Sequence, residues 1–368
     1  MLGDVVTYER NLPQSPYTID AQLFAQLTTR FRKPYQPLAW PGFGAKVSQL
    51  IDKYGIVGSL HVFFEGTMAG DGVGAPTATS GFPWRFISEA RVSANGLSQL
   101  IDVDGIDLRA LARVRRGRSL ADASVFTLPA SGTTVPLRLH WEIPLALDEV
   151  SLIGAVLAQT DDNVLSLRLT AAASADLFSA HAPTITGSFY VLASAYEIPE
   201  TTVKGQKTLV IPDLRQMHGL FTRDDNLVAT GLNANPLTKT GGILLRTLQR
   251  IDNAPPNFGN VDWLTDAVTE HAFRFNSKEI PYDYEPAWML RFLNEADYAQ
   301  SLLPAADMPA GITAPAYVVD DYVSSVAARD VVNMAAVSQP EMLNTITAGY
   351  GLNAGAKIHT VQEAMVTG

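Results

Sequence analysis

The chain has 368 residues, of which 47% are hydrophobic and 17% charged, with a formal net charge of −10 and no cysteine. This composition is too apolar for a disordered protein, and it excludes disulfides and cysteine-based zinc sites. The negative charge argues against sequence-independent coating of nucleic acid, and the length suggests two domains.

The N-terminal region, residues 1–45, is predicted to be an arm followed by a helix. Residues 1–17 are polar and show little periodicity, and we see neither a secretory signal nor an apolar run of about 18 residues that could span a membrane. Residues 18–33 are predicted to be helical because apolar residues recur every four positions, at Ile19, Leu23, Leu27 and Phe31. Pro34 would end this helix, after a basic last turn formed by Arg30, Arg32 and Lys33.

The rest of the chain has the pattern of an all-β protein. Short runs of β-branched and aromatic residues are separated by frequent glycine and proline, which is typical of a sandwich rather than of βαβ units. In 137–141 and 165–169, apolar and polar residues alternate, as in strands with one buried face. The predicted strands are 56–64, 86–92, 135–143, 164–170, 185–193, 208–211, 243–251, 272–275 and 317–319, with a final hairpin over 343–350 and 357–361.

Two short helices are predicted within this β pattern. One follows Asp148, a plausible N-cap, over 151–157, and the other begins at Pro286 and continues to about 303. Each follows a strand ending in Glu-Ile-Pro, at 142–144 and 279–281, which indicates a structural duplication. We therefore expect a first β-domain at 46–203 and a second at 204–368, divided within the polar stretch 199–207.

No catalytic, cofactor or metal site is predicted. None of the six histidines, His61, His140, His181, His218, His271 and His359, has metal-ligand spacing, and no GxSxG elbow is present. The glycine-rich stretches 70–74 and 351–357 lack the context of nucleotide-binding loops. The aspartate pairs at 161–162, 224–225 and 320–321 are interpreted as solvated turns rather than calcium sites. The basic run 113–118 fits a solvated hairpin loop or, alternatively, a surface facing anionic lipid or an acidic neighbour.

The segment 141–159, followed by Leu165-Ser-Leu-Arg-Leu169, resembles the strand–helix–strand of the first jelly roll in tectivirus-like major capsid proteins. Further segments are similar in order: an early strand from Tyr54, a hairpin with Asn95-Gly96, a crossover over 189–214 and a last strand over 343–351. This resemblance implies an all-β chain of two jelly-roll barrels, each with a short helix in one connection, preceded by the N-terminal helix. It also implies a structural protein that is not an enzyme and needs no cofactor.

For function, the resemblance implies a homotrimer that forms a pseudo-hexagonal capsomer and tiles an icosahedral shell around an internal membrane and genome. Its partners would be neighbouring capsomers, the penton and minor or cement proteins, without sequence-specific nucleic-acid binding. The protein would be made in the host cytoplasm and reside in the virion, and Arg30, Arg32 and Lys33 could face the membrane. Two alternatives remain: a β-sandwich carbohydrate-binding protein or enzyme, and a minor vertex or spike protein of the virion.

Overall fold

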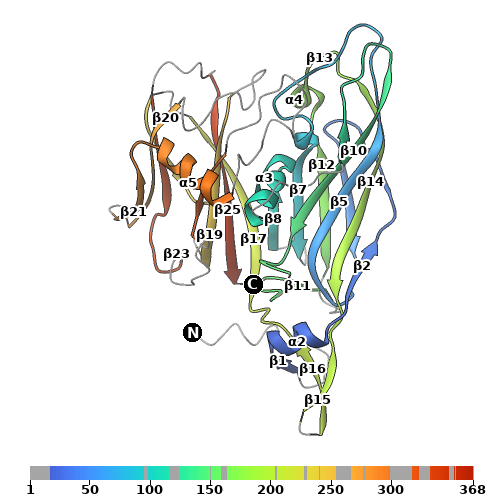
Figure 1. The fold of residues 1–368 in the computed structure, drawn as a ribbon, viewed down its shortest axis with the longest axis vertical. Coiled ribbons are helices and arrows are strands. Elements are labelled where there is room, and N and C mark those ends of the chain that lie inside the picture. The colour runs from blue at the N-terminus through green and yellow to red at the C-terminus, as the bar shows by residue number, and fades with distance from the viewer. Residues whose placement is uncertain are drawn as a thin grey trace.

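The computed structural model describes the chain except for residues 1–16, 95–97, 117–123, 150, 159–163, 204, 228–229, 240, 254–266, 277–278, 299–316, 323–331, 348–351, 353 and 368. Most of its strands run along the long axis of the molecule and form two β-sandwiches that stand side by side (Figure 1). The predicted all-β fold class is therefore confirmed.

The first sandwich has two facing sheets that share one hydrophobic core. The first sheet contains, in spatial order, β2 (Arg30–Pro34), β14 (Thr184–Tyr196), β5 (Ile56–Ala69), β10 (Thr134–Pro144) and β9 (Val125–Phe126), extended by β3 (Leu38–Ala39) and β11 (Val156–Leu157). The second contains β8 (Ser98–Val103), β7 (Ile87–Ala94), β12 (Leu165–Ala171) and β4 (Lys46–Ile51). The chain crosses between sheets from β4 to β5, β5 to β7, β10 to β12 and β12 to β14, which is the path of a jelly roll.

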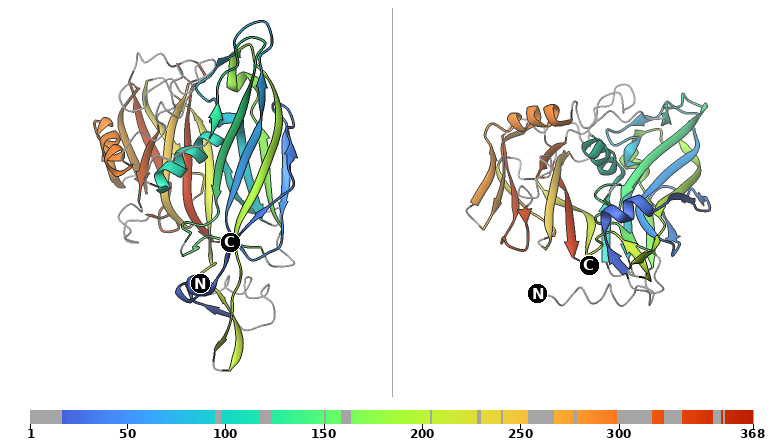
Figure 2. Two further views of the ribbon diagram at one scale, coloured as in Figure 1. Left: turned by 45° about the vertical axis from the view of Figure 1, so that its right-hand side comes forward. Right: turned by 60° about the horizontal axis from the view of Figure 1, so that its bottom comes forward.

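The connections of the first sandwich contain its helices and a small strand pair. These elements are the 3₁₀ helix η1 (Trp84–Phe86), α3 (Gly105–Arg116), α4 (Ser174–Leu177) and the pair β6 (Thr77–Ala78) and β13 (Phe178–Ala180). In the right-hand view of Figure 2, α3 lies between the two sandwiches. This position lets α3 contact both halves of the molecule.

The second sandwich repeats the two-sheet plan. One sheet contains β22 (Val318–Asp321), β19 (Ile243–Asp252), β25 (Lys357–Thr367) and β17 (Gln216–Asn226), with β23 (Val332–Asn333) beside β19. The other contains β18 (Gly231–Pro236), β24 (Glu341–Ile346), β20 (Val268–Phe275) and β21 (Glu279–Tyr284). The helix α5 (Trp288–Tyr298) connects β21 to β22, which confirms the helix predicted from Pro286 over the residues that the structure describes.

One continuous sheet joins the two sandwiches. Strand β8 of the first half pairs in parallel with β17 of the second, through Leu220 with Ile101 and Phe221 with Asp102. At these positions the facing edges of the two halves satisfy each other's backbone hydrogen bonds, which protects them from unwanted pairing.

A smaller sheet projects beyond the sandwiches at the lower end of the molecule in Figure 1. It contains β1 (Tyr17–Ile19), β16 (Gln206–Ile211) and β15 (Glu200–Val203), and the short helix α2 (Ala21–Leu27) packs beside it. The polar stretch 199–207 thus forms the β15–β16 hairpin between the two sandwiches.

The alternation seen in the sequence places the core residues of the first sandwich. On β10, Leu137, Leu139, Trp141 and Ile143 are buried, while the intervening residues point to the outer face. Phe86 of η1 stacks on Trp141 and also contacts Phe64 and Phe189, which lie on the same sheet as Trp141. Burial of such large rings supplies much of the hydrophobic free energy of a sandwich.

Two predicted helices are wrong in position. The predicted helix over 18–33 is not formed as such: α2 ends at Leu27, and Arg30–Pro34 form β2, where they pair with β14. The predicted helix over 151–157 is absent, although the Asp148 side chain accepts a hydrogen bond from the Ser151 N–H as an N-cap would. Leu152 and Gly154 then adopt positive φ values of 52° and 86°, which end the turn, and Val156–Leu157 form β11.

The final hairpin and the Glu-Ile-Pro correspondence are also wrong. Strands β24 and β25 belong to different sheets and do not pair with each other. The first Glu-Ile-Pro ends β10, whereas the second begins β21, so the two copies occupy different places in the fold. The longer helix of the first jelly roll is α3, which precedes β10 instead of following it.

Candidate functional site

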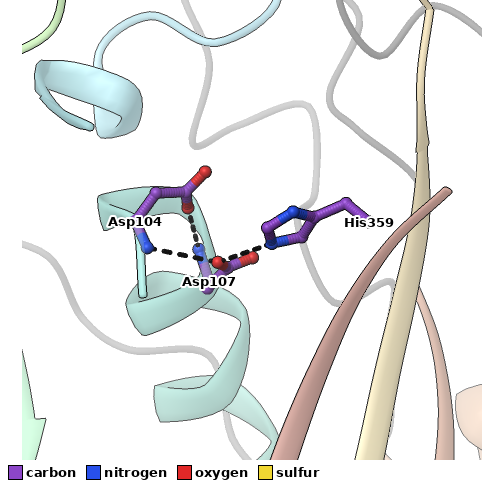
Figure 3. Close-up of side chains that lie close together, drawn as sticks. All are labelled: Asp104, Asp107 and His359. Carbon is purple, nitrogen blue, oxygen red and sulfur yellow. Dashed lines mark hydrogen bonds and ion pairs between the residues drawn. The ribbon is translucent and has the colours of Figure 1, made fainter. Parts of the chain in front are cut away.

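A buried network of charged side chains connects the two jelly rolls. Asp104 and Asp107 lie at the start of α3 in the first half, and Arg250 and His359 come from β19 and β25 in the second. The Arg250 Nη2 lies 2.7 Å from the Asp104 Oδ2, and its Nη1 contacts the Asp107 Oδ1. The His359 Nε2 lies 2.9 Å from the Asp107 Oδ2, as Figure 3 shows. Residues more than 140 positions apart in the sequence thus share one site.

The start of α3 positions the two aspartates through a reciprocal hydrogen-bond pair. The Asp104 Oδ1 accepts from the Asp107 N–H at 2.8 Å, and the Asp107 Oδ2 accepts from the Asp104 N–H at 3.2 Å. This arrangement is a capping box, which satisfies two backbone donors at the helix N-terminus. The remaining carboxylate oxygens then face the second jelly roll.

The network has further members on both sides. Arg250 also donates through Nε to the Asp252 Oδ1 at 2.8 Å, and Arg85 of η1 donates to the Asp252 Oδ2 at 2.9 Å. The Tyr317 hydroxyl donates to the Asp107 Oδ1 at 2.7 Å. Each carboxylate here accepts from several donors, as buried charges require.

Two opposing effects set the pKa values in this network: burial disfavours the charged form of each group, and neighbouring groups of opposite charge favour it. Burial raises the pKa of Asp107 and Asp252, but Arg250 outweighs it and holds both carboxyl pKa values well below the ordinary range. Burial and the nearby Arg250 disfavour the charged His359 ring, yet Asp107 and Asp224 outweigh both and raise the pKa of His359 to about 10. The His359 Nδ1 lies 2.6 Å from the Asp224 Oδ1, so both ring nitrogens donate to carboxylates and the ring is an imidazolium at neutral pH.

Asp104, Asp107 and His359 are residue types that bind divalent cations, and their ligand atoms lie within 4.8 Å of one another. The positive charge at this place is already supplied by the Arg250 guanidinium, which contacts both carboxylates. His359 uses both ring nitrogens as donors, so neither carries a lone pair for a metal. The cluster is therefore an ion-pair joint without an open coordination position.

A second buried network centres on Glu363 of β25. Its Oε1 lies 2.8 Å from the His218 Nε2, and its Oε2 accepts from the Arg246 Nη1 at 2.8 Å. The His218 Nδ1 lies 3.1 Å from the carbonyl oxygen of Pro144, and Arg115 of α3 reaches within 3.9 Å of Glu363. This network also joins the two halves, because Pro144 and Arg115 belong to the first jelly roll.

The structure contradicts the interpretation of the basic run from Arg113 as a solvated hairpin loop, over the residues that it describes. Residues 113–116 are the last turn of α3, and Arg113 is only 3% exposed. Arg115 donates to the carbonyl oxygens of Ala146 and Leu147.

The aspartate pairs that the structure describes are not solvated turns either. Asp224 and Asp320 lie on strands and accept from His359 and His271. Asp161 and Asp162 lie outside the described residues.

The residues predicted to face a membrane lie on a strand rather than on a helix. Arg30 makes a two-pronged ion pair with Glu149, at 2.8 and 2.9 Å, and Lys33 lies 2.5 Å from Asp52. Alternate residues of a strand point to opposite faces, so Arg30 and Arg32 share one face and Lys33 lies on the other. Arg32 is exposed. The three side chains therefore do not form one basic surface.

Sequence reasoning missed both buried networks. The signal at 104–107, Asp-Gly-Ile-Asp, has the spacing of a capping box and could have located the start of α3. The pairing of these aspartates with Arg250 has no local signal, because it depends on the parallel contact between β8 and β17.

Comparison with solved structures decides the fold family. No protein-family model and no curated protein match this sequence. The crystal structure of the STIV MCP aligns over 92% of this chain and 97% of its own, with a TM-score of 0.67 and 16% identity. The PBCV-1 virus capsid structure aligns over 92% and 94%, with a TM-score of 0.60 and 11% identity. This chain has the double jelly-roll fold of viral major capsid proteins.

A third similar structure is the major capsid protein P2 from bacteriophage PM2, with a TM-score of 0.51, 10% identity, and coverage of 92% of this chain and 98% of that one. Double jelly rolls this divergent in sequence keep only the fold in common, because many sequences with the same apolar alternation fill the same sandwich. The network residues of this chain are therefore argued from its own geometry.

Proposed function

We propose that this protein is a viral major capsid protein that trimerises into pseudo-hexagonal capsomers. The observation that carries the proposal is the near-complete mutual coverage with the STIV MCP, 92% of this chain and 97% of that one. Both jelly rolls are included in this alignment, so the likeness extends to their side-by-side arrangement. A single sandwich domain of a binding protein or enzyme would match only half of such a neighbour.

The physical basis is a rigid pair of sandwiches. The β8–β17 pairing and the two buried networks hold the halves at a fixed angle. Three such pairs arranged around an axis place six sandwiches in a ring, through a heterologous interface that closes on itself. In this proposal the chain divides at 203/204, within the β15–β16 hairpin: the first jelly roll is 46–203, to which β2 and β3 add strands, and the second is 204–368.

The proposed partners are two further copies of the chain, neighbouring capsomers, and penton and minor proteins of a virion shell. The protein would be made in the host cytoplasm and act structurally, without catalysis or a cofactor. Among the described residues, no helix is both long and apolar enough to cross a bilayer.

Light scattering of the purified protein tests the assembly. We expect a particle of three times the 39.7 kDa of one chain, and hexagonal arrays or shells in electron micrographs at high concentration. A monomer that persists at high concentration contradicts the proposal. A vertex or spike protein would also be oligomeric, but it would be scarce in particles, whereas a shell protein is the most abundant band.

We propose that Arg30, Arg32 and Lys33 contact the membrane only weakly and that Arg32 contributes most to this contact. Each basic residue near an anionic surface contributes about 1 kcal/mol, or roughly fivefold in partitioning. Flotation with phosphatidylserine vesicles should therefore show about a fivefold loss for Arg32→Gln and a smaller loss for Arg30→Gln, which has Glu149 as its partner. Equal flotation of wild type and Arg32→Gln contradicts lipid contact at this strand.

A further inference from the structure

Two histidines on neighbouring strands of the first jelly roll approach each other closely on the outer face of the sheet. The His61 Nδ1 on β5 lies 3.2 Å from the His140 Nε2 on β10. The two rings are nearly parallel, with 5.4 Å between their centroids. Two imidazole nitrogens bound to one tetrahedral Zn²⁺ at about 2.0–2.1 Å lie roughly 3.3–3.4 Å apart, so the pair already has the spacing of two zinc ligands.

A carboxylate lies on the same face of the sheet as this pair, although its oxygens are not within 4.8 Å of both histidine nitrogens. Glu142 is directly opposite His61 in the antiparallel register of β5 and β10, and His140 lies two residues earlier on the same face. Side chains directly opposite each other in such a pair have Cβ atoms about 4.5–5.5 Å apart. Two imidazoles and one carboxylate form a common ligand set for zinc, with the fourth position left to water.

The three residues line a cavity of about 560 Å³, bounded on another side by Leu108 and Leu111 of α3. The cavity has room for a cation and its water ligands. Ser59, which is 4% exposed and lies two residues before His61 on the same face of β5, also lines the cavity. Its hydroxyl oxygen has no hydrogen-bond partner among the residues that the structure describes, which indicates a place for an additional polar molecule.

Three arginines line the cavity. Two of them have carboxylate or carbonyl partners, and the third, Arg32, is exposed. Arg30 is held by Glu149, and Arg115 donates to the carbonyl oxygens of Ala146 and Leu147. This differs from the Asp104–Asp107–His359 cluster, where an arginine occupies the position that a cation would take. The cavity beside His61 and His140 is therefore the better place for a metal ion.

We propose that His61 and His140, assisted by Glu142, bind one Zn²⁺ in this cavity. The ion replaces the proton that the two imidazoles share, and it links β5 to β10 beside α3. This inference is independent of the proposed capsid function, because a metal bound by these strands does not require assembly.

Zinc titration of the full-length protein tests the proposal. The protein is stripped with a chelator and titrated with ZnCl₂ by isothermal calorimetry. We expect one ion per chain, at least tenfold weaker binding by His61→Asn and by His140→Asn, and a smaller loss by Glu142→Gln. His181→Asn is the matched control, because His181 is a partly exposed histidine whose Nδ1 contacts Asp71 instead of a second histidine, and its binding should equal that of the wild type.

A second measurement protects the test against a variant that fails to fold. Co²⁺ added to the metal-free wild-type protein should give the intense visible absorption of a four-coordinate site with nitrogen ligands, and Zn²⁺ should abolish it. The absence of stoichiometric binding by the wild type overturns the proposal. Binding that survives both His61→Asn and His140→Asn also overturns it, because the ion then lies elsewhere.

Discussion

Arg250 is the side chain on which the joint between the two jelly rolls depends most. Its side chain is fully buried, and it contacts Asp104, Asp107 and Asp252. Arg250→Met keeps much of the volume and removes the charge, which leaves these carboxylates in a low-dielectric site without their cation. We expect a loss of about 3–5 kcal/mol in the free energy of unfolding, measured by urea denaturation.

Arg138→Met is the matched control for that substitution. Arg138 also pairs with a carboxylate, with 2.9 Å between its Nη2 and the Glu65 Oε1, but the two side chains are 61% and 55% exposed. Exposed pairs contribute about 0–1 kcal/mol because water screens them. Equal destabilisation by the two substitutions would show that the buried network has no special role.

His359 makes the stability of the joint sensitive to alkaline pH. Its pKa is raised to about 10 in the folded protein, above the ordinary value of 6.5. The stabilisation that this charge provides is therefore complete below about pH 6.5 and is lost as the pH rises through about 10. We expect the free energy of unfolding to fall between about pH 6.5 and 10, with a weaker decline in His359→Gln. Tyrosines and lysines also titrate near pH 10, so the informative quantity is the difference between wild type and variant, and parallel curves would contradict this assignment.

At the scale of elements, α3 contacts both sandwiches, and its first residue, Gly105, is closely surrounded by other atoms. A Cβ added to Gly105 would lie 2.1 Å from the carbonyl oxygen of Trp84 and 2.7 Å from the Trp141 Nε1. The higher helix propensity of alanine contributes at most about 1 kcal/mol, whereas overpacking costs about 1–3 kcal/mol and backbone is involved here. We expect Gly105→Ala to lower the midpoint of thermal unfolding.

Gly241→Ala is the control for this substitution, because a Cβ at Gly241 would meet no described atom within 4 Å. Its midpoint should equal that of the wild type or rise slightly, since alanine restricts the unfolded chain. An unchanged midpoint for Gly105→Ala would show that η1 and β10 can move away from α3 at no cost.

The elements differ in how far the sequence determines them. The strands around Leu137–Trp141 and Leu165–Leu169 could be predicted, because alternation of buried and exposed residues is a local signal. The helix α3 was missed because Arg109 and Arg113, which suggest a surface, are buried in contact with neighbouring groups such as the Trp84 ring. The segment after Asp148 has a helical start signal, but β11 pairs with β5 instead, so tertiary pairing overrides the local preference.

At the scale of the whole molecule, the division into two jelly rolls could be predicted, whereas the contacts that join them could not. The parallel pairing of β8 with β17 and the contacts of Arg250 with Asp104 and Asp107 join residues far apart in the sequence, and no spacing rule reports them. The candidate zinc ligands were likewise hidden, because His61 and His140 become neighbours only through the register of β5 and β10. Sequence patterns therefore locate the sandwiches, and the contacts between distant strands determine the charged sites.

The joint between the two jelly rolls predicts how the chain behaves when it is cut between its two halves. The β15–β16 hairpin turns at Gly205, outside both sandwiches, so a protease site inserted after Val203 should be accessible. After cleavage, the β8–β17 pairing and the buried networks should keep the two pieces together as one particle in gel filtration, with a small decrease in the unfolding midpoint. When the halves are expressed separately, each exposes an unpaired strand edge and unpaired buried charges, and we expect both to aggregate. Separation of the cleaved pieces into two stable, soluble domains would contradict the proposed rigid joint.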